Sequence, residues 1–204
     1  MPPASRIFPG ARAGCLLLQD GASLIHYDTE RKRRISSVSY SGVKAAVWSA
    51  DSRHLALLAK LAVHLLDSAL SALHTVSLRT APKSGAWCAL TGAFLFTTEL
   101  QLRYALPCGE EGALLSLSTP LYICSVDTEA GRVVCMDRAR RPRSLEVNTH
   151  EYWFKAAVLG GREEEVVGLV RRGRLGKRLW FQVAFSPRMK RLRVTAASFL
   201  ATSP

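Results

Sequence analysis

The stretch VWSADSRHLALLAK, residues 47–60, decides the fold of this chain. It places an aromatic residue before the segment Ser49–Ser52 and follows that segment with an apolar run, HLALLAK at residues 54–60. Asp and Ser side chains favour turns because they hydrogen-bond to nearby backbone groups, and short apolar runs bounded by such residues are typical of strands. The stretch therefore predicts a strand, a tight turn and a second strand.

The apolar run recurs along the chain at nearly constant spacing. The copies are GCLLLQD (14–20), HLALLAK (54–60), AFLFTTE (93–99) and GRVVCMD (131–137). Trp48 and Trp87 precede two of these copies and are separated by the same interval as the copies themselves. An internal period of about 40 residues indicates a repeat architecture.

Further strand patterns complete the repeat. VKAAVWSAD (43–51) and KSGAWCAL (83–90) precede two of the apolar runs, and other strand patterns follow each run. Four short strands in about 40 to 45 residues is the period of a β-propeller blade. The runs do not alternate strictly, as expected of strands that neighbouring blades cover on both faces. We therefore predict a mainly β fold, a partial WD-type β-propeller of about four blades over residues 1–147 that begins inside a blade.

The pattern changes at Asn148. This residue is suited to cap a helix that has Glu151 three positions later, and the helix is predicted to end at Gly160–Gly161. A second helix is predicted to begin at Arg162, because Glu163–Glu165 suit the positive amino end of a helix. Two short helices after a β repeat predict the start of an α-solenoid.

The formal net charge of +12 is concentrated near the carboxyl end. Residues 1–170 hold 19 Lys+Arg and 16 Asp+Glu, whereas residues 171–204 hold 9 and none. We expect the solenoid start to occupy residues 148–175 and a divergent, unstructured basic tail to occupy residues 176–204. A basic tail can bind phosphates, but Trp180, Phe181 and Phe185 lie before the cluster Arg188–Arg193 rather than within it, so nucleic acid is not favoured as a partner.

Targeting segments and cysteine frameworks are not indicated. No apolar stretch reaches the roughly 18 residues of a spanning helix, and no apolar segment follows the amino-terminal arginines as in a secretory signal. The five cysteines are odd in number and form no CxxC pair, which argues against disulfides and a zinc module. They are Cys15, Cys88, Cys108, Cys124 and Cys135. We expect a soluble, cytoplasmic chain in which most of these cysteines are buried.

Residues that could carry chemistry do not form a recognisable site. No GxSxG, GxGxxG or GxxxxGK[ST] motif occurs. Four histidines are expected at strand edges or turns: His26, His54, His64 and His74. Glu110–Glu111 is expected in a hairpin turn, because adjacent residues of a strand face opposite sides and cannot act as a carboxylate pair. We therefore predict no catalytic, cofactor-binding or metal-ligating residue, no cofactor, no small-molecule substrate and no enzyme activity.

Several short segments carry a resemblance to a known family, and they run collinearly from about Ile7 to Arg172. They are VWSAD (47–51), ALLAK (56–60), KSGAW (83–87), Thr97–Thr98, RYA (103–105), PLYI (120–123), DR (137–138), RPR (141–143) and FK (154–155). On these residues the chain resembles the coatomer alpha-subunit family, at the point where the second β-propeller runs into the α-solenoid. The β′ coatomer subunit is built alike and is the next closest resemblance.

The resemblance implies a structural role in the coat of vesicles that move between the Golgi and the endoplasmic reticulum. It implies the other coatomer subunits as partners and peripheral association with Golgi and vesicle membranes. In this family the site that reads dilysine retrieval signals lies on the first propeller, outside the matching stretch. No cargo-site residue is therefore carried over to this chain.

Two other classes of function stay open, and the tail departs from the family pattern. The chain could be a generic propeller scaffold outside the coat, or an RNA-associated fragment that binds through its basic tail. From about Gly176 the sequence no longer shows the amphipathic pattern of further solenoid helices. We hypothesise a shifted reading frame, a retained intron or a truncated gene model beyond about residue 175.

Overall fold

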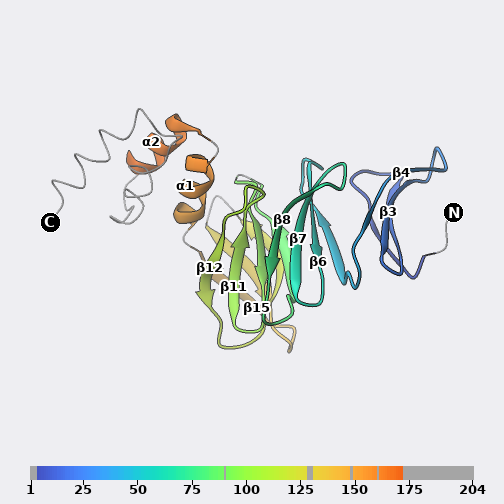
Figure 1. Ribbon diagram of the computed structural model, residues 1–204. Helices are drawn as coiled ribbons and strands as arrows, with labels where there is room; N and C mark the ends of the chain where they lie inside the picture. Colours follow the sequence, from blue (N-terminus) through green and yellow to red (C-terminus); the bar gives the residue numbers. More distant parts are fainter. Residues whose placement is uncertain (1–3, 90, 128–130, 148, 160, 172–204) are drawn as a thin grey trace. The chain divides into compact units, whose positions relative to one another are not determined.

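The computed structural model describes residues 4–89, 91–127, 131–147, 149–159 and 161–171 (Figure 1). The chain divides into two compact units, Met1–Val147 and Asn148–Pro204. The described part of the first unit consists of antiparallel sheets, and the described part of the second contains two helices. None of the helices in these ranges is both long enough and apolar enough to cross a membrane.

The described residues of the first unit form four consecutive sheets, each a meander in which a strand pairs antiparallel with the next strand along the chain. The first sheet contains β1 (Arg6–Pro9), β2 (Cys15–Asp20), β3 (Ser23–Asp28) and β4 (Arg33–Ser39). The second contains β5 (Ala45–Trp48), β6 (His54–Leu58), β7 (Ala62–Asp67) and β8 (Ala72–Ser77). The third contains β9 (Ser84–Trp87), β10 (Phe94–Thr97), β11 (Gln101–Ala105) and β12 (Glu111–Ser116). The fourth contains β13 (Tyr122–Asp127), β14 (Arg132–Met136) and β15 (Pro142–Glu146).

The predicted repeat is confirmed, because the four apolar runs form β2, β6, β10 and β14. The prediction that the chain begins inside a blade is wrong, since β1 completes the first sheet. This strand pairs with β2 from Arg6 opposite Gln19 to Pro9 opposite Leu16. Its sequence, RIFP, lacks the tryptophan that marks β5 and β9, so the repeat pattern did not reveal it.

The opening stretch forms β5, a tight turn and β6, as predicted. The backbone amide of Ser49 donates to the carbonyl of His54 at 2.9 Å, and the amide of Ser52 donates to the carbonyl of Ser49 at 2.9 Å. The Asp51 carboxylate accepts hydrogen bonds from the Ser49 hydroxyl at 2.6 Å and the Arg53 amide at 3.1 Å. The bond from Ser49 is the main reason that the pKa of Asp51 lies below its usual value. Local polar bonds therefore set this turn, as the sequence indicated.

Both faces of β6 are buried, which explains why its apolar run does not alternate. Leu55 belongs to a buried cluster with Leu17 of the first sheet. Ala56, one residue later, belongs to a second cluster with Phe94 of the third sheet. Each fully buried leucine of this strand contributes about 1.5 to 3 kcal/mol relative to an exposed one. The second sheet is thus held between its neighbours by two separate apolar layers.

The sheets are joined at their first strands. β1 contacts β5, β5 contacts β9, and β9 contacts β13. Figure 1 shows β6, β7 and β8 side by side, with β11 and β12 of the next sheet following them. Meander sheets that stack face to face and meet along their first strands are the blades of a propeller. The predicted fold class, a mainly β chain with a partial propeller, is confirmed.

The second unit contains α1 (Thr149–Leu159) and α2 (Glu163–Arg171). Tyr152 and Phe154 of α1 are buried. Gly161 adopts a left-handed φ of 69° after α1, which glycine tolerates because it has no Cβ atom. The second helix begins one residue later than predicted and has three glutamates in its first turn. The predicted cap, Asn148, and the predicted tail lie outside the described residues, as does the side chain of Glu151.

Candidate functional site

The two repeat tryptophans connect neighbouring blades. Trp87, at the end of β9, donates its indole Nε1 hydrogen to the carbonyl of Val47 in β5 at 2.8 Å. Trp48, at the end of β5, donates in the same way to the carbonyl of Pro9 in β1 at 3.1 Å. The acceptors lie on first strands, which have a strand partner on only one side. Each tryptophan therefore satisfies a backbone carbonyl of the preceding blade while its ring covers part of the interface.

A histidine accompanies each tryptophan across the interface. The ring centroids of His26 and Trp48 are 5.6 Å apart, and those of His54 and Trp87 are 5.7 Å apart. The expectation that every histidine lies at an edge or turn is wrong for His26, which is buried in the interior strand β3. It is also wrong for the half-buried His64 in β7. A histidine that packs against the next blade is invisible to pattern analysis, because its partner belongs to another repeat.

The buried His26 has an electrostatic consequence. Neither ring nitrogen has a hydrogen-bond partner among the residues that the structure describes, although both are buried. Burial lowers the pKa of His26 below its usual value, and nearby Arg12 lowers it further. The imidazole is therefore neutral at neutral pH, and its buried ring packs against Trp48.

The fourth sheet is joined to the third by a different contact. The backbone amide of Ile123 in β13 donates to the Ser84 hydroxyl of β9 at 2.7 Å. The Ser84 hydroxyl also bonds to the Thr97 hydroxyl at 2.9 Å, which fixes its orientation. Side-chain hydroxyls thus replace the tryptophan at this interface. Thr97 was among the residues that carry the family resemblance, and this contact gives it a structural role.

The two adjacent glutamates occupy different structural positions. The turn after β11 is closed by bonds from the Gly109 amide to the Leu106 carbonyl at 3.0 Å and from the Leu106 amide to the Glu110 carbonyl at 2.7 Å. Glu111 is already the first residue of β12. Its carboxylate lies 3.3 Å from His74 of the second sheet and 3.4 Å from Arg103. The pair therefore consists of a turn residue, Glu110, and an inter-blade hydrogen-bond partner, Glu111.

The cysteines follow the expected pattern. Cys15, Cys88 and Cys135 are buried, whereas Cys108 and Cys124 are exposed. Burial raises the pKa of the Cys135 thiol to about 11, so it is protonated at neutral pH. In the described part of the chain, no three His, Cys, Asp or Glu side chains are grouped so that they could hold a metal ion.

A shallow pocket on the fourth sheet was not predicted. It has a volume of about 260 Å³ and lies between the segment before β13 and the turn that joins β14 to β15. Its lining consists of Thr119, Pro120, Asp137, Arg138, Ala139, Arg141 and Arg143. The basic segment DRARRPR at positions 137–143 is the sequence signal for this pocket, but the nearly balanced charge of residues 1–170 taken as a whole does not single it out.

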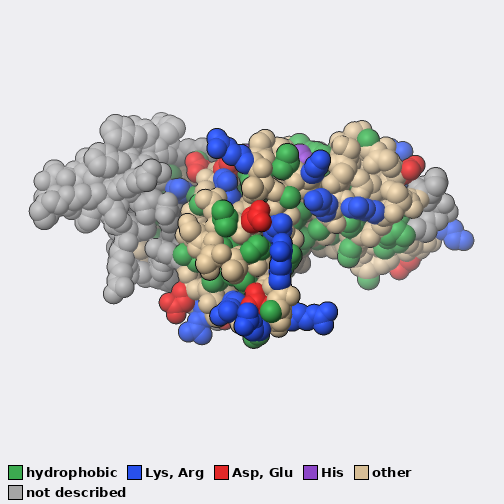
Figure 2. Space-filling view, turned by 90° about the horizontal axis from the view of Figure 1, so that it is seen from below, with side chains coloured by type: hydrophobic (Ala, Val, Ile, Leu, Met, Phe, Trp, Pro, Cys, Tyr) green, Lys and Arg blue, Asp and Glu red, His purple; other side chains and the backbone are tan. Residues whose placement is uncertain are grey.

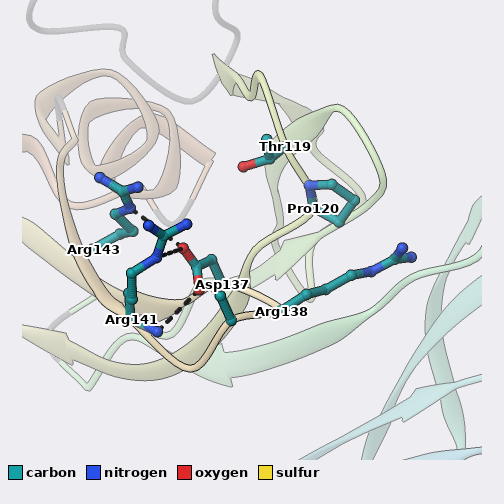
Figure 3. Close-up of a pocket in the computed structure, with 7 residues that line it drawn as sticks. Thr119, Pro120, Asp137, Arg138, Arg141 and Arg143 are labelled. Atoms are coloured by element: carbon teal, nitrogen blue, oxygen red, sulfur yellow. Dashed lines mark hydrogen bonds and ion pairs between the residues drawn. The ribbon is translucent and has the colours of Figure 1, made fainter.

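Asp137 organises this pocket (Figure 3). Its carboxylate accepts from the backbone amide of Arg141 at 2.9 Å and from the Nε of the same residue at 3.1 Å, and the Nε of Arg143 lies 3.7 Å away. The bond from the Arg141 amide is the largest cause of the lowered pKa of Asp137. Figure 3 shows Arg141 and Arg143 converging on Asp137 from one side, with Arg138 extending on the other. The pocket therefore combines one ionised carboxylate with three guanidinium groups.

Comparisons with known proteins place these features in a family. Residues 2–137 match the family described as COPA/B second beta-propeller. The chain is 30% identical over 175 residues to coatomer subunit alpha-2 of Oryza sativa subsp. japonica, covering 86% of this chain and 14% of that protein. It is 28% identical over 169 residues to coatomer subunit alpha of Dictyostelium discoideum, covering 83% and 14%.

Among solved structures, the computationally designed Ika8 protein matches with a TM-score of 0.56 and 11% identity over 71% of this chain and 47% of that one. That likeness concerns the fold alone. The chain spans about one seventh of the length of the coatomer subunits that it matches. The sequence match agrees with the four successive meander sheets: the chain belongs to the COPA/B second beta-propeller family.

Proposed function

We propose that this chain is a structural component of the coatomer vesicle coat and acts as a protein–protein interaction scaffold in transport between the Golgi and the endoplasmic reticulum. The observation that carries this proposal is the family match over residues 2–137 together with collinear similarity to coatomer alpha subunits. Its partners are the other coatomer subunits, and it associates peripherally with Golgi and vesicle membranes through the coat.

The inter-blade contacts support a mechanical role. A scaffold transmits force and holds several weak contacts in fixed positions, so that binding at one contact raises the effective concentration at the next. Apolar clusters and the Trp48 and Trp87 bonds hold the blades in such a fixed order. We propose no catalytic residue, cofactor or small-molecule substrate for this role.

We also propose a domain organisation. Residues 1–147 form the propeller blades, residues 148–175 begin the α-solenoid, and residues 176–204 form a basic tail. The division of the chain into units at Val147 and Asn148 supports the first boundary. The helical pair α1 and α2 supports the assignment of the second segment.

Affinity capture from a cytosolic extract tests the proposed function. The tagged full chain is expected to retain other coatomer subunits, identified by mass spectrometry. A tagged Trp48→Ala/Trp87→Ala variant, in which two blade contacts are removed, should retain markedly less. A folded chain that captures no coatomer subunit would contradict coat membership and favour a scaffold outside the coat.

RNA association makes a different prediction. Capture of RNA that weakens steeply with salt and disappears on deletion of residues 176–204 would instead support the RNA-associated class. The same extract, treated with or without ribonuclease, separates this outcome from coat binding. Coatomer subunits retained equally after ribonuclease treatment would support the proposed coat function.

A further inference from the structure

The turn between β14 and β15 has an unusual charge for its geometry. The Asp137 amide donates to the Arg141 carbonyl at 3.1 Å, and the Arg140 amide donates to the Asp137 carbonyl at 3.0 Å. Arg140 adopts a left-handed φ of 61°. Four arginines and one aspartate occupy positions 137–143, which leaves this short turn with a net charge of +3. Like charges this close repel one another, so the arrangement needs an explanation.

The chain contains a matched turn without these charges. Between β7 and β8, the Asp67 amide donates to the Ser71 carbonyl at 3.0 Å, and the Leu70 amide donates to the Asp67 carbonyl at 3.1 Å. Leu70 has a φ of 68°, and the Asp67 carboxylate accepts from the Ser71 amide at 2.7 Å. Each bond has its counterpart at Asp137, yet the neutral segment Ser68–Ser71 completes this turn. The arginines are therefore not required by the backbone geometry.

The ion pairs at Asp137 leave the binding edges of two arginines available. Arg141 and Arg143 both approach the Asp137 carboxylate through Nε. A guanidinium has five N–H donors, so their terminal nitrogens remain able to donate to a second anion. The hydrogen bond at Nε restrains the Arg141 donors, which reduces the entropy lost when a ligand binds, whereas the Arg143 Nε lies only within ion-pair range of the same carboxylate at 3.7 Å. Two guanidinium groups, of which Arg141 is hydrogen-bonded to Asp137, thus border the pocket.

The rest of the pocket fits a small oxyanion. The Asp137 side chain is only 10% exposed, and its negative charge is offset by Arg141 and Arg143. Its repulsion of an anion in the pocket is therefore weak. Arg138, at the opposite side in Figure 3, has no hydrogen-bond or ion partner among the described residues. Thr119 lies across from Asp137 and brings a hydroxyl donor. Figure 2, which views the molecule from below, shows several Lys and Arg side chains at the lower edge of the drawn face, with Asp or Glu side chains among them.

From this arrangement we propose that the pocket formed by Thr119, Pro120 and the turn 137–143 binds a phosphate monoester dianion. Arg141 and Arg143 contact the phosphate oxygens through their terminal nitrogens, and Arg138 closes over it. Two negative charges would offset most of the excess positive charge of the turn. The phosphate can belong to a soluble molecule or to a lipid headgroup, and the two sources present the same chemistry to the pocket.

Titration of the full chain tests the proposal. Inorganic phosphate is expected to shift the NMR signals of the 137–143 amides and arginine Nε groups in a saturable manner. The variant Arg138→Ser/Arg140→Asn/Arg141→Ser mimics the neutral turn at Asp67 and keeps a residue that tolerates positive φ at position 140. It should fold with an unchanged circular dichroism spectrum and bind phosphate at least about tenfold more weakly.

Two further variants keep the test specific. Arg31→Gln/Arg33→Gln/Arg34→Gln removes the same number of charges from exposed positions at the β3–β4 hairpin and should bind phosphate as the parent chain does. Arg141→Lys/Arg143→Lys keeps both charges but removes the planar guanidinium groups and the Arg141 Nε bond to Asp137, so binding should weaken at least about threefold. Equal losses in the hairpin and pocket variants, or unchanged affinity in the lysine variant, would overturn the proposed site.

Vesicle sedimentation distinguishes the two phosphate sources. The chain is mixed with phosphatidylcholine vesicles with or without phosphatidylinositol 4-phosphate. Sedimentation that needs the phosphorylated lipid and is lost in the neutral-turn variant identifies a headgroup as the source. Phosphate binding without such sedimentation identifies a soluble phosphate. Absence of both saturable phosphate binding and lipid-dependent sedimentation in the parent chain would refute the proposal.

Discussion

Replacing Trp87 tests whether the tryptophans hold the blades together. The indole is half-buried, lies 5.1 Å from the Phe94 ring between centroids, and donates to the Val47 carbonyl. Truncation of a fully buried tryptophan to alanine costs about 3 to 5 kcal/mol through lost transfer energy and cavity formation. Because Trp87 is only half-buried, we expect Trp87→Ala to cost about 3 kcal/mol, at the lower end of that range.

A second substitution separates the hydrogen bond from the packing. Trp87→Phe keeps an aromatic ring against Phe94 but removes the indole donor, so the Val47 carbonyl loses its partner. The net contribution of one such bond is about 1 kcal/mol. The difference between the two variants, about 2 kcal/mol, then measures the packing of the ring between the blades.

Urea unfolding followed by circular dichroism provides the free energies, because this probe does not depend on tryptophan fluorescence. Leu100→Ala is the matched control, since Leu100 is 60% exposed and its loss should change the free energy of unfolding by less than about 0.5 kcal/mol. A cost below about 1 kcal/mol for Trp87→Ala would refute the inference that this side chain is packed between blades.

Two further predictions concern close packing and pH. Gly85→Ala should lower the free energy of unfolding by about 1 to 3 kcal/mol, because the new Cβ would lie 2.3 Å from the Phe94 ring. Gly168→Ala in α2 should instead raise the free energy of unfolding by up to about 1 kcal/mol, because its Cβ meets open space. Equal effects of the two substitutions in urea unfolding would contradict this difference. The pKa of His26 is lower in the folded chain than in the unfolded chain, so the unfolded chain takes up the proton first as the pH falls. The contribution of His26 to the free energy of unfolding should therefore be fully present above about pH 6.5 and decrease as the pH drops below that value. His26→Phe should reduce this fall between pH 7.5 and pH 5.5, and an unchanged pH dependence would show that other groups cause it.

The blade repeat could be predicted because its determinants are local. Apolar runs, turn residues such as Asp51 and the regular spacing of Trp48 and Trp87 lie within single repeats or recur with them. The same reasoning missed β1, whose short sequence lacks that tryptophan. The prediction that His26 lies at a strand edge or turn was also wrong, because its burial depends on the next blade and the residues around it in the sequence do not indicate that contact.

The basic pocket was harder to predict for a related reason. Thr119 and Asp137 are separated by a complete hairpin, and only the folded fourth sheet brings them to one pocket. The charges of DRARRPR are visible in the sequence, but the anchoring of Arg141 and Arg143 through Nε is not. The turn at Asp67 has the same backbone hydrogen bonds and no arginines, which shows that the backbone geometry at Asp137 does not require the arginines.

The sequence by itself determined the period, the strands other than β1, the turns such as that at Asp51, and the change to helices after Val147, because these follow from hydrogen bonding and apolar patterning over short distances. The tertiary structure alone decided which face of β6 meets which sheet and which carbonyl accepts from each tryptophan. Those contacts join residues of consecutive repeats, far apart along the chain. They depend on how twisted sheets stack, which no local pattern specifies.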